Sequence, residues 1–421
     1  MKTPEKRFDR RNFLQTVGAA GLVSATAGLA RAKEKQRAQS PAPGEKQKPT
    51  PIPLRKVGKS KVKVPVLCLG GNYNLVDRQI ILRKALESGL TFWDTAHNYA
   101  GGNSELGIGK FLAAYPQARK KLLIASKASY ATNVDQVEER LQLSLKRLKT
   151  NYLDLYFGVH FMSEPDQLTD ELKKWALDAK KRGVIRLFGF STHKNMAKLL
   201  TAAAKLDWID VILTVYNFRL RQDPKMQAAI EACHKAGIGL VAMKALASGP
   251  VARWAKHEVT VETEEDRRLV GHFLKKGMTP GQAKINVILQ DKRFCSVCVS
   301  MQSMALLDEN IAAVSGGSKL SRADIGLLDE YARATCTGYC AGCAEICEAA
   351  VPEAPYISDI MRYLMYYNSY GRHDEARDLF AAIPSPVRRK LPQLDYTLAE
   401  ARCPQRLPIR KLVSEALEKL A

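Results

Sequence analysis

Four side chains capable of acid–base chemistry follow short apolar segments in the first half of the chain. They are Asp94, which closes Thr-Phe-Trp, Tyr99 five residues later, Lys127, which closes Leu-Leu-Ile-Ala-Ser, and His160, which closes Leu-Tyr-Phe-Gly-Val. A phenol has a pKa near 10, and a nearby ammonium group lowers that value. A carboxylate keeps the lysine charged, and an imidazole can donate to a carbonyl oxygen. The set therefore predicts protonation of a carbonyl oxygen while hydride arrives from another molecule.

The elements that must position these groups alternate between strand and helix. A helix is predicted where Val134, Val137, Leu141, Leu145 and Leu148 share one face. Eight β–α repeats predict a parallel (β/α)8 barrel, whose chemistry collects at the carboxyl ends of the strands. A doubly wound sheet is the alternative, but no G-x-G-x-x-G follows the first strand. The eight predicted strands are Val64–Leu69, Thr91–Thr95, Leu122–Ser126, Tyr152–Val159, Val184–Phe190, Val211–Val215, Ile238–Ala242 and Cys295–Val299.

Over about residues 54–315 the sequence resembles the aldo/keto reductase family. The matching stretches are F-W-D-T-A-H-N-Y-A-G-G-N-S-E-L-G-I-G, L-L-I-A-S-K, L-K-R-L-K-T-N-Y-L-D-L-Y-F-G-V-H, G-V-I-R-L-F-G-F-S-T-H, V-Y-N-F and L-L-D-E-N, in family order. The resemblance implies that Asp94, Tyr99, Lys127 and His160 form the catalytic tetrad. It also implies hydride transfer between NAD or NADP and a small-molecule carbonyl or alcohol substrate.

The same resemblance implies a set of cofactor-binding residues. Ser191 and Thr192 would hold the nicotinamide carboxamide, and Tyr216 would stack on its ring. The phosphate segment would be Ser300, Met301, Gln302 and Ser303, and the adenine site Glu309 and Asn310. Leu213 stands where the family often has Gln, which puts one nicotinamide hydrogen bond in doubt. NADP-preferring members of the family have Lys and Arg side chains, which hold the 2′-phosphate, at the positions of Ser300 and Leu306. Because a phosphate without a cation is poorly held, the sequence favours NAD at least as much as NADP.

Five of the nine cysteines lie beyond the predicted barrel. Cys336, Cys340, Cys343 and Cys347 form C-x3-C-x2-C-x3-C, and Cys403 precedes Pro404. Four thiols within twelve residues would strain to pair as disulfides, and crowded thiolates are typical metal ligands. An iron–sulfur cluster is favoured over zinc, whose ligands usually form two separated C-x2-C pairs. The first three cysteines also match a radical-SAM pattern, but they follow the last barrel helix instead of opening the barrel.

The tail resembles, more weakly, a ferredoxin-like extension found on a subgroup of aldo/keto reductases. That resemblance implies one 4Fe–4S cluster held by Cys336, Cys340 and Cys343 with either Cys347 or Cys403. Residues 356–382 are predicted to form two helices whose Met and Tyr side chains pack in a core. The whole fold is then an α/β barrel with a C-terminal, mainly helical iron–sulfur extension.

The N-terminus has the features of an export signal. Arg10-Arg11-Asn12-Phe13-Leu14 matches the twin-arginine pattern, and a weakly apolar stretch leads to Ala30-Arg31-Ala32, a cleavage pattern. The predicted parts are a signal peptide at 1–32, a Pro/Lys-rich linker at 33–53, the barrel at 54–332 and the cysteine-rich tail at 333–421. The twin-arginine translocase would export the protein, for example to the periplasm, already folded and loaded with cofactor.

The distribution of charge along the chain argues against nucleic-acid binding. The formal net charge is +22, but residues 1–64 alone hold 16 Lys/Arg against 4 Asp/Glu. No basic stripe with interleaved aromatic residues occurs, and no run of eighteen apolar residues is present to span a membrane. The predicted protein is an oxidoreductase whose cluster passes electrons to a partner. The alternative is a non-catalytic, redox-responsive binding subunit that keeps the barrel.

Overall fold

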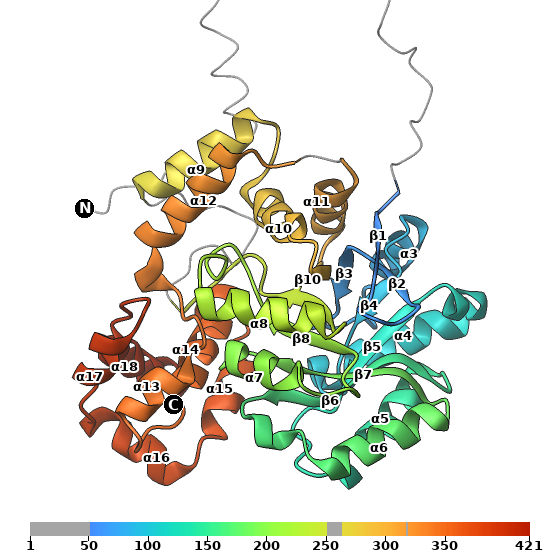
Figure 1. The fold of residues 1–421 in the computed structure, drawn as a ribbon, viewed down its shortest axis with the longest axis horizontal. Coiled ribbons are helices and arrows are strands. Elements are labelled where there is room, and N and C mark those ends of the chain that lie inside the picture. Colours follow the sequence, from blue (N-terminus) through green and yellow to red (C-terminus); the bar gives the residue numbers. More distant parts are fainter. Residues whose placement is uncertain (1–50, 251–262, 317–318) are drawn as a thin grey trace, which may run out of the picture. The chain divides into compact units, whose positions relative to one another are not determined.

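The computed structural model describes residues 51–250, 263–316 and 319–421 (Figure 1). The predicted signal peptide at 1–32 and most of the linker at 33–53 lie outside the described residues. Within the rest, Thr50–Ala421 forms one compact unit.

Eight parallel strands close into a barrel within this unit. Going round the barrel, the strand order is β10-β3-β4-β5-β6-β7-β8-β9, and β10 pairs with both β3 and β9. This arrangement confirms the predicted (β/α)8 barrel. The strands are β3 (Leu67–Gly70), β4 (Phe92–Asp94), β5 (Leu123–Lys127), β6 (Leu153–Met162), β7 (Ile185–Thr192), β8 (Val211–Val215), β9 (Gly239–Met243) and β10 (Phe294–Ser300).

The first predicted strand is divided in the structure. β2 (Lys63–Pro65) pairs with β1 (Leu54–Lys56) in an antiparallel hairpin, whereas β3 belongs to the barrel. Pro65 has no N–H group to donate to a continuing ladder, which explains why the strand breaks there. The apolar pattern alone joined two strands that belong to different sheets.

Helices surround the barrel, and their ends have identifiable causes. α5 begins after Asn133, whose side chain accepts a hydrogen bond from the Gln136 N–H, and it ends at Lys149, which adopts φ 52°. Its predicted apolar face is buried at Val137, Leu141, Leu145 and Leu148 and half-buried at Val134. The helices of this part are α3 (Gln79–Glu87), α4 (Asn103–Ala114), α5 (Val134–Leu148), α6 (Asp170–Lys181), α7 (Met196–Ala203), α8 (Pro224–Lys235), α9 (Glu264–Lys275), α10 (Pro280–Gln290), α11 (Met304–Ser315) and α12 (Arg322–Ala334).

The tail is a group of short helices with its own buried core (Figure 1). Met361, Tyr363 and Met365 belong to that core, as predicted for the Met and Tyr side chains. A π-helical turn, Met365–Ser369, continues the first of the two helices predicted over 356–382. The tail helices are α13 (Ala344–Ala350), α14 (Ile357–Leu364), α15 (His373–Ala381), α16 (Ser385–Lys390), α17 (Thr397–Arg402) and α18 (Ile409–Leu420).

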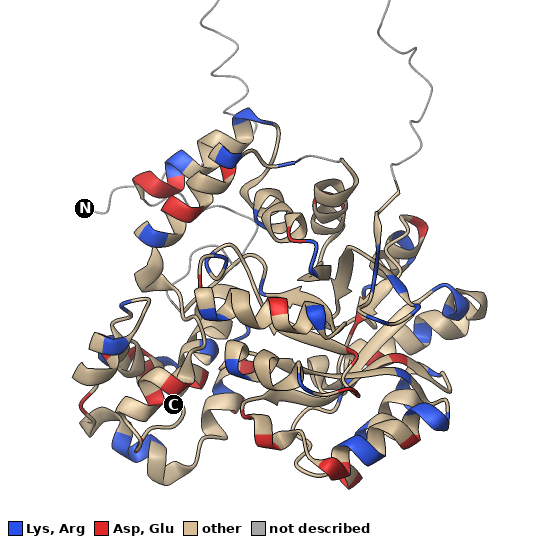
Figure 2. Ribbon diagram, in the orientation of Figure 1, with Lys and Arg blue, Asp and Glu red and all other residues tan. Residues whose placement is uncertain are grey.

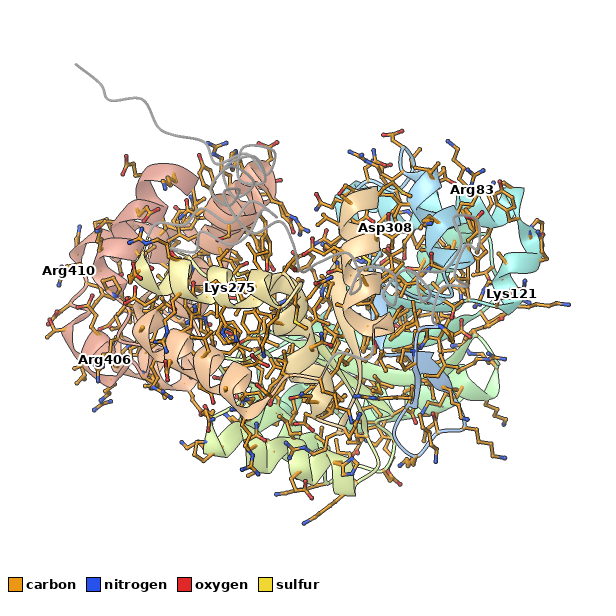
Figure 3. All side chains as sticks on the ribbon, turned by 90° about the horizontal axis from the view of Figure 1, so that it is seen from above. Arg83, Lys121, Lys275, Asp308, Arg406 and Arg410 are labelled. Atoms are coloured by element: carbon orange, nitrogen blue, oxygen red, sulfur yellow. The ribbon has the colours of Figure 1, made fainter. Side chains whose placement is uncertain are left out.

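Charges of both signs are scattered over the helices of the described part, without a basic stripe (Figure 2). Exposed charged side chains lie at the periphery of both barrel and tail, as the labels in Figure 3 show for Arg83, Lys121, Lys275, Asp308, Arg406 and Arg410. No helix among the described residues is long and apolar enough to cross a membrane.

Candidate active site

A buried ion pair lies at the carboxyl ends of β4 and β5. Lys127 Nζ donates to both carboxylate oxygens of Asp94, each at 2.7 Å, and to the carbonyl oxygen of Thr95, also at 2.7 Å. Lys127 is fully buried and Asp94 is 5% exposed. Since an ammonium group has three hydrogens, all of the donors of Lys127 are used. The lysine therefore acts on its other neighbours as a fixed positive charge and not as a hydrogen-bond donor.

Tyr99 lies beside this ion pair in a short 3₁₀ turn after β4. Lys127 Nζ is 4.6 Å from the centroid of the Tyr99 ring. Burial and the Asp94 carboxylate nevertheless hold the pKa of Tyr99 well above its ordinary value. The expected net lowering of this pKa is therefore not found, because burial and, after it, the Asp94 charge raise it. The phenol keeps its proton at neutral pH.

His160, on β6, forms the other side of the site. Its ring centroid is 6.0 Å from that of Tyr99. Its Nδ1 lies 2.5 Å from Ser129 Oγ, and Ser129 donates to Asn98 Oδ1 at 2.6 Å. Because an amide oxygen only accepts, the Ser129 proton is used there, and His160 Nδ1 must be the donor to Ser129. Burial holds the pKa of His160 well below 6.5, so the ring is neutral and Nε2 is an acceptor. The expectation that His160 donates to a carbonyl oxygen is corrected accordingly.

The tail reaches over this mouth and contacts several of the loops around it. Arg372 donates to the carbonyl oxygen of Asn72, after β3, at 2.8 Å. Ser369 donates to the carbonyl oxygen of Gly249, after β9, also at 2.8 Å. Near β6, the Arg362 guanidinium lies 4.9 Å from the centroid of the Phe161 ring. The tail is therefore part of the surroundings of the catalytic candidates.

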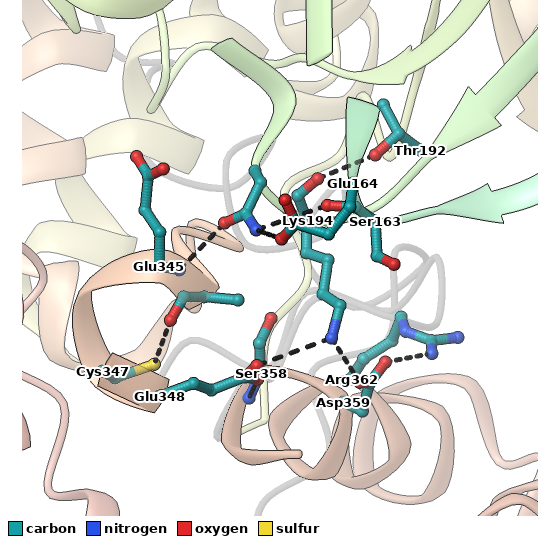
Figure 4. Close-up of polar contacts among 12 residues, drawn as sticks. Ser163, Glu164, Thr192, Lys194, Glu345, Cys347, Glu348, Ser358, Asp359 and Arg362 are labelled. Atoms are coloured by element: carbon teal, nitrogen blue, oxygen red, sulfur yellow. Dashed lines mark hydrogen bonds and ion pairs between the residues drawn. The ribbon is translucent and has the colours of Figure 1, made fainter. Parts of the chain in front are cut away.

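Ion pairs and one close backbone approach fix the tail to the loop after β7. Lys194 Nζ lies 2.9 Å from Asp359 and 3.6 Å from Glu348, both on tail helices (Figure 4). The Gly342 carbonyl oxygen accepts from the Asn195 N–H at 2.7 Å. A Cβ at Gly342, whose φ is +76°, would come within 2.4 Å of the neighbouring carbonyl oxygen of His193. Only glycine fits at this position.

A cavity lies between the mouth of the barrel and the tail. It has about 420 Å³ of atom-free space, its opening included. Barrel residues His193, Lys244 and Ser248 line one side. Cys340 and Arg362 line the other. The cavity is thus made jointly by strand ends of the barrel and by the cysteine-rich tail.

The residues implied for the dinucleotide lie at strand ends and at one helix start. Ser191 and Thr192 end β7 and are fully buried. Ser300 ends β10, the Met301 carbonyl oxygen accepts from Tyr73, and Gln302 leads to Ser303, the N-cap of α11. Backbone N–H groups at such a helix start suit a phosphate.

The implied adenine residues differ in their contacts. Glu309 Oε1 accepts from Thr279 at 2.5 Å. Asn310 is 4% exposed, and its Nδ2 has no hydrogen-bond partner. A buried donor left without an acceptor is costly, so this amide fits a ligand that accepts from it.

Tyr216 does not lie where the resemblance implies. Its ring is 1% exposed and stacks on Phe294 with centroids 4.4 Å apart. Its hydroxyl accepts from Gln227, on α8 outside the barrel, at 3.0 Å. The ring faces the helix layer and offers no open face to a nicotinamide. Leu213, which replaces the family's Gln, is 3% exposed on β8.

Four of the five tail cysteines surround one cavity. Cys340, Cys343, Cys347 and Cys403 line about 360 Å³ of atom-free space, its opening included. Cys336 is not among them. It begins a separate 3₁₀ turn, Cys336–Gly338, four residues before Cys340. The structure therefore does not place Cys336 with the other four cysteines, as the sequence predicted. The structure brings together both Cys347 and Cys403, which the sequence left as alternatives.

The four thiols around the tail cavity are a possible donor set for an iron–sulfur cluster. Burial raises the pKa of Cys343 to about 11 and that of Cys347 to about 12. Within the described part of the chain, no three His, Cys, Asp or Glu side chains are close enough to hold one metal ion. A 4Fe–4S cluster is held by four Cys thiolates, so the cavity offers the donor type and number that this group requires.

A closed parallel barrel with a tyrosine, lysine, aspartate and histidine at its strand ends defines a class of nicotinamide-dependent oxidoreductases. The sequence pattern of the Aldo/keto reductase family matches residues 60–333. The chain belongs to the aldo/keto reductase family and is an NAD(P)-dependent oxidoreductase.

Individual relatives agree with this assignment. Aldo-keto reductase AFTS1 of Alternaria alternata is 26% identical over 284 residues, which cover 59% of this chain and 76% of the relative. L-galactose dehydrogenase of Arabidopsis thaliana is 25% identical over 251 residues, covering 57% and 78%. L-glyceraldehyde 3-phosphate reductase of Escherichia coli O157:H7 is 25% identical over 327 residues, covering 66% and 91%.

Solved structures show the same barrel. A thermostable aldo-keto reductase crystallised with the inhibitor epalrestat superposes with a TM-score of 0.54 at 26% sequence identity. The superposition covers 66% of this chain and 100% of that chain. The holo form of aldo-keto reductase AKR11C1 from Bacillus halodurans gives a TM-score of 0.55 at 21% identity, covering 66% and 96%. The second similarity supports the fold alone.

Sequence reasoning missed several residues of this site. Ser129 and Asn98 set the tautomer of His160, but nothing in their spacing indicates that role. Lys244 directly follows β9, so the strand-end rule that found Lys127 could have found it too. Arg362 comes from the tail, and only the fold brings it to the mouth.

Proposed function

We propose that Asp94, Tyr99, Lys127 and His160 carry out the proton chemistry of this oxidoreductase, with Tyr99 as the proton donor to a carbonyl oxygen. The observation that carries the proposal is the fully buried Lys127, held by three acceptors beside the Tyr99 ring. Its fixed charge stabilises the negative charge that develops on the phenol oxygen as the proton leaves. The neutral His160 accepts from a substrate hydroxyl and so orients the alcohol form.

The cofactor is NAD or NADP, which supplies or accepts the hydride when bound. Ser191 and Thr192 would hold its carboxamide, the segment Ser300–Ser303 its phosphates, and Glu309 and Asn310 its adenine end. The unpartnered Asn310 amide supports this placement. Tyr216 is left out of the binding set, since its ring is enclosed between Phe294 and α8.

The test of the proton donor is Tyr99→Phe, with Tyr115→Phe as its control. Tyr115 is 39% exposed and packs on Phe111, away from the ion pair. With 4-nitrobenzaldehyde as the probe, Tyr99→Phe should lower turnover by roughly 10²–10⁴-fold and leave cofactor affinity unchanged. Tyr115→Phe should behave like the wild type. Near-normal turnover in Tyr99→Phe would remove Tyr99 from its role.

We also propose one 4Fe–4S cluster in the tail, held by Cys340, Cys343, Cys347 and Cys403, which exchanges single electrons when bound. Four half-buried or buried thiols around one cavity are costly to deprotonate unless positive charge neutralises them, and irons supply that charge. Apolar side chains of the cavity, Ile346, Leu407 and Ile409, would limit access of water to the cluster.

The cluster cavity and the mouth cavity have a common wall. Cys340, Ala341, Ser358 and Met361 line both of them. We infer that the cluster exchanges single electrons with a partner at the tail, whereas the hydride, which carries two electrons, passes between the nicotinamide and the substrate carbon in the barrel. A purely binding role is not favoured, because the matched family and its named relatives are enzymes.

Export by the twin-arginine translocase is proposed from Arg10-Arg11 and the apolar stretch that follows. The proposed division remains a signal at 1–32, a linker at 33–53, the barrel at 54–332 and the tail at 333–421. The double variant Arg10→Lys, Arg11→Lys should remain in the cytoplasm with its nucleotide bound. Periplasmic recovery of that variant would contradict the route.

A further inference from the structure

Two barrel cysteines that the proton chemistry does not use lie side by side on neighbouring strands. Cys68, on β3, and Cys298, on β10, are directly paired in the parallel ladder. Neighbouring strands lie about 4.7–4.9 Å apart, and paired residues of a parallel ladder point to the same face of the sheet. The α-carbons of a disulfide are usually about 4.4–6.8 Å apart. The two strands therefore hold these thiols at a spacing that a disulfide bond accepts.

The two thiols differ in their access to solvent. Cys68 is 0% exposed, whereas Cys298 is half-buried. A Cβ added at Gly70 would lie 3.2 Å from Cys298 Sγ. The sulfur of Cys298 therefore leans toward β3, the strand that carries both Gly70 and Cys68. An oxidant from solvent can meet Cys298, but the barrel shields Cys68 from it.

The two cysteines also lie next to the ion pair of Asp94 and Lys127. Burial raises the pKa of Asp94, whereas the charge of Lys127 and hydrogen bonds from Lys127 and the Cys298 thiol act against that rise. Burial, and after it a hydrogen bond with Cys298, raises the pKa of Cys68 well above its ordinary value. A chain of contacts thus runs from Cys68 through Cys298 to the Asp94 carboxylate.

The other two cysteines of the barrel have backbone partners instead. Cys233 Sγ donates to the carbonyl oxygen of Leu200 at 3.3 Å, and Cys295 Sγ donates to that of Leu240 at 3.2 Å. Burial raises the pKa of each of these two thiols to about 12. Both are therefore inert thiols, and they supply controls for the pair formed by Cys68 and Cys298.

We propose that Cys68 and Cys298 are a redox-active dithiol, which a peroxide oxidises to a disulfide that fastens the first strand of the barrel to the last. In the first step the Cys298 sulfur attacks the peroxide. An S–O bond forms, the O–O bond breaks, and the thiol proton leaves with the hydroxide as water.

The second step uses the shielded thiol. The Cys68 sulfur attacks the sulfur of the Cys298 sulfenic acid, so that the S–S bond forms and the S–O bond breaks. The Cys68 proton leaves with the hydroxide as a second water molecule. The two sulfur atoms together lose two electrons, and the peroxide gains them. A dithiol reductant reverses the change by thiol–disulfide exchange.

Peptide mapping of the full-length protein tests the proposal. The reduced protein is treated with hydrogen peroxide, remaining free thiols are blocked with N-ethylmaleimide after denaturation, and the digest is analysed by mass spectrometry. The wild type should yield a peptide pair that joins Cys68 to Cys298. Treatment with dithiothreitol before the blocking step should abolish that pair and restore both thiols.

Three single variants separate the roles of the thiols. Cys298→Ser should leave Cys68 free and blocked by N-ethylmaleimide, because the thiol that meets the peroxide is missing. Cys68→Ser should stop at the sulfenic acid of Cys298, which dimedone traps. Cys295→Ser is the matched control on the same strand, and it should form the bridge like the wild type.

Urea unfolding gives a second readout. A bridge from Cys68 to Cys298 closes a long loop in the unfolded chain and so restricts the unfolded state. The oxidised wild type should therefore unfold at a higher urea concentration than the reduced wild type. Cys298→Ser treated with peroxide measures the effect of oxidising the remaining cysteines, and its midpoint should not rise.

Two results would overturn the proposal. The first is wild-type protein in which peroxide leaves Cys68 free, whether Cys298 is oxidised to sulfenic or sulfinic acid or is unmodified. The second is a bridged wild type whose urea midpoint is not raised, because the bond would then strain the barrel instead of fastening its strands.

Discussion

The ion pair between Lys127 and Asp94 makes a quantitative prediction about stability. Both side chains are withdrawn from water, with 0% and 6% of their surfaces exposed. Removing one partner of a buried ion pair leaves an uncompensated charge, which costs about 3–5 kcal/mol. Lys127→Met and Asp94→Asn should therefore each lower the free energy of unfolding by about that amount. The double variant buries no charge and should lose no more than either single variant.

The assay is urea unfolding followed by tryptophan fluorescence, because Trp93 is fully buried directly beside Asp94. The sum of the two single losses should exceed the loss in the double variant by at least about 3 kcal/mol. Turnover cannot replace this readout, since all three variants lack catalytic groups. Single losses below about 1 kcal/mol, or an additive double variant, would refute the claim that a buried pair holds the lysine.

Three further predictions concern the tail and the histidines. Cys403→Ser should lose the iron that Cys336→Ser keeps, by iron and sulfide analysis of anaerobically isolated protein. Gly342→Ala should speed limited proteolysis of the tail, because the added Cβ meets the His193 carbonyl oxygen; an unchanged rate would contradict that contact. Burial holds the pKa values of His160 and His193 well below 6.5. Below about pH 6.5 the unfolded chain therefore binds more protons than the folded protein does. The free energy of unfolding then falls as the pH drops, by up to about 1.4 kcal/mol per pH unit for each ring. His193→Gln should flatten that fall in urea unfolding at pH 7, 6 and 5.

The barrel could be predicted from the sequence because its strands are short, apolar and separated by amphipathic helices. Each of the eight predicted strands corresponds to one in the structure, although Val64–Leu69 spans two elements. The strand-end rule then placed Asp94, Lys127 and His160 at one mouth without knowledge of any distance. Periodicity and topology together carry this much information.

Directions of side chains and signs of pKa shifts could not be predicted in the same way. Tyr216 follows β8 as expected, but its ring turns toward Phe294, a choice made by packing and not by spacing. The pKa of Tyr99 depends on whether Asp94 or Lys127 dominates at the phenol, which needs the actual burial. The tautomer of His160 depends on Ser129 and Asn98, whose hydrogen bonds no motif encodes.

The tail shows the same limit for long-range contacts. The spacing of Cys336 with Cys340 and Cys343 suggested a shared ligand set, whereas the fold gathers both Cys347 and Cys403 around the cavity and leaves Cys336 outside it. The Met and Tyr side chains of the helical segment that contains Tyr366 were correctly predicted to pack in a core. The π-helical turn Met365–Ser369 has no counterpart in the apolar pattern.

The central proposal beyond the family assignment is that the tail holds one 4Fe–4S cluster through Cys340 and the three other thiols of its cavity. Electron paramagnetic resonance of the anaerobically isolated full-length protein after reduction with dithionite tests it directly. The predicted result is the signal of a reduced 4Fe–4S cluster in the wild type and its absence in Cys340→Ser. Wild-type protein that contains no iron and gives no such signal after reduction would contradict it.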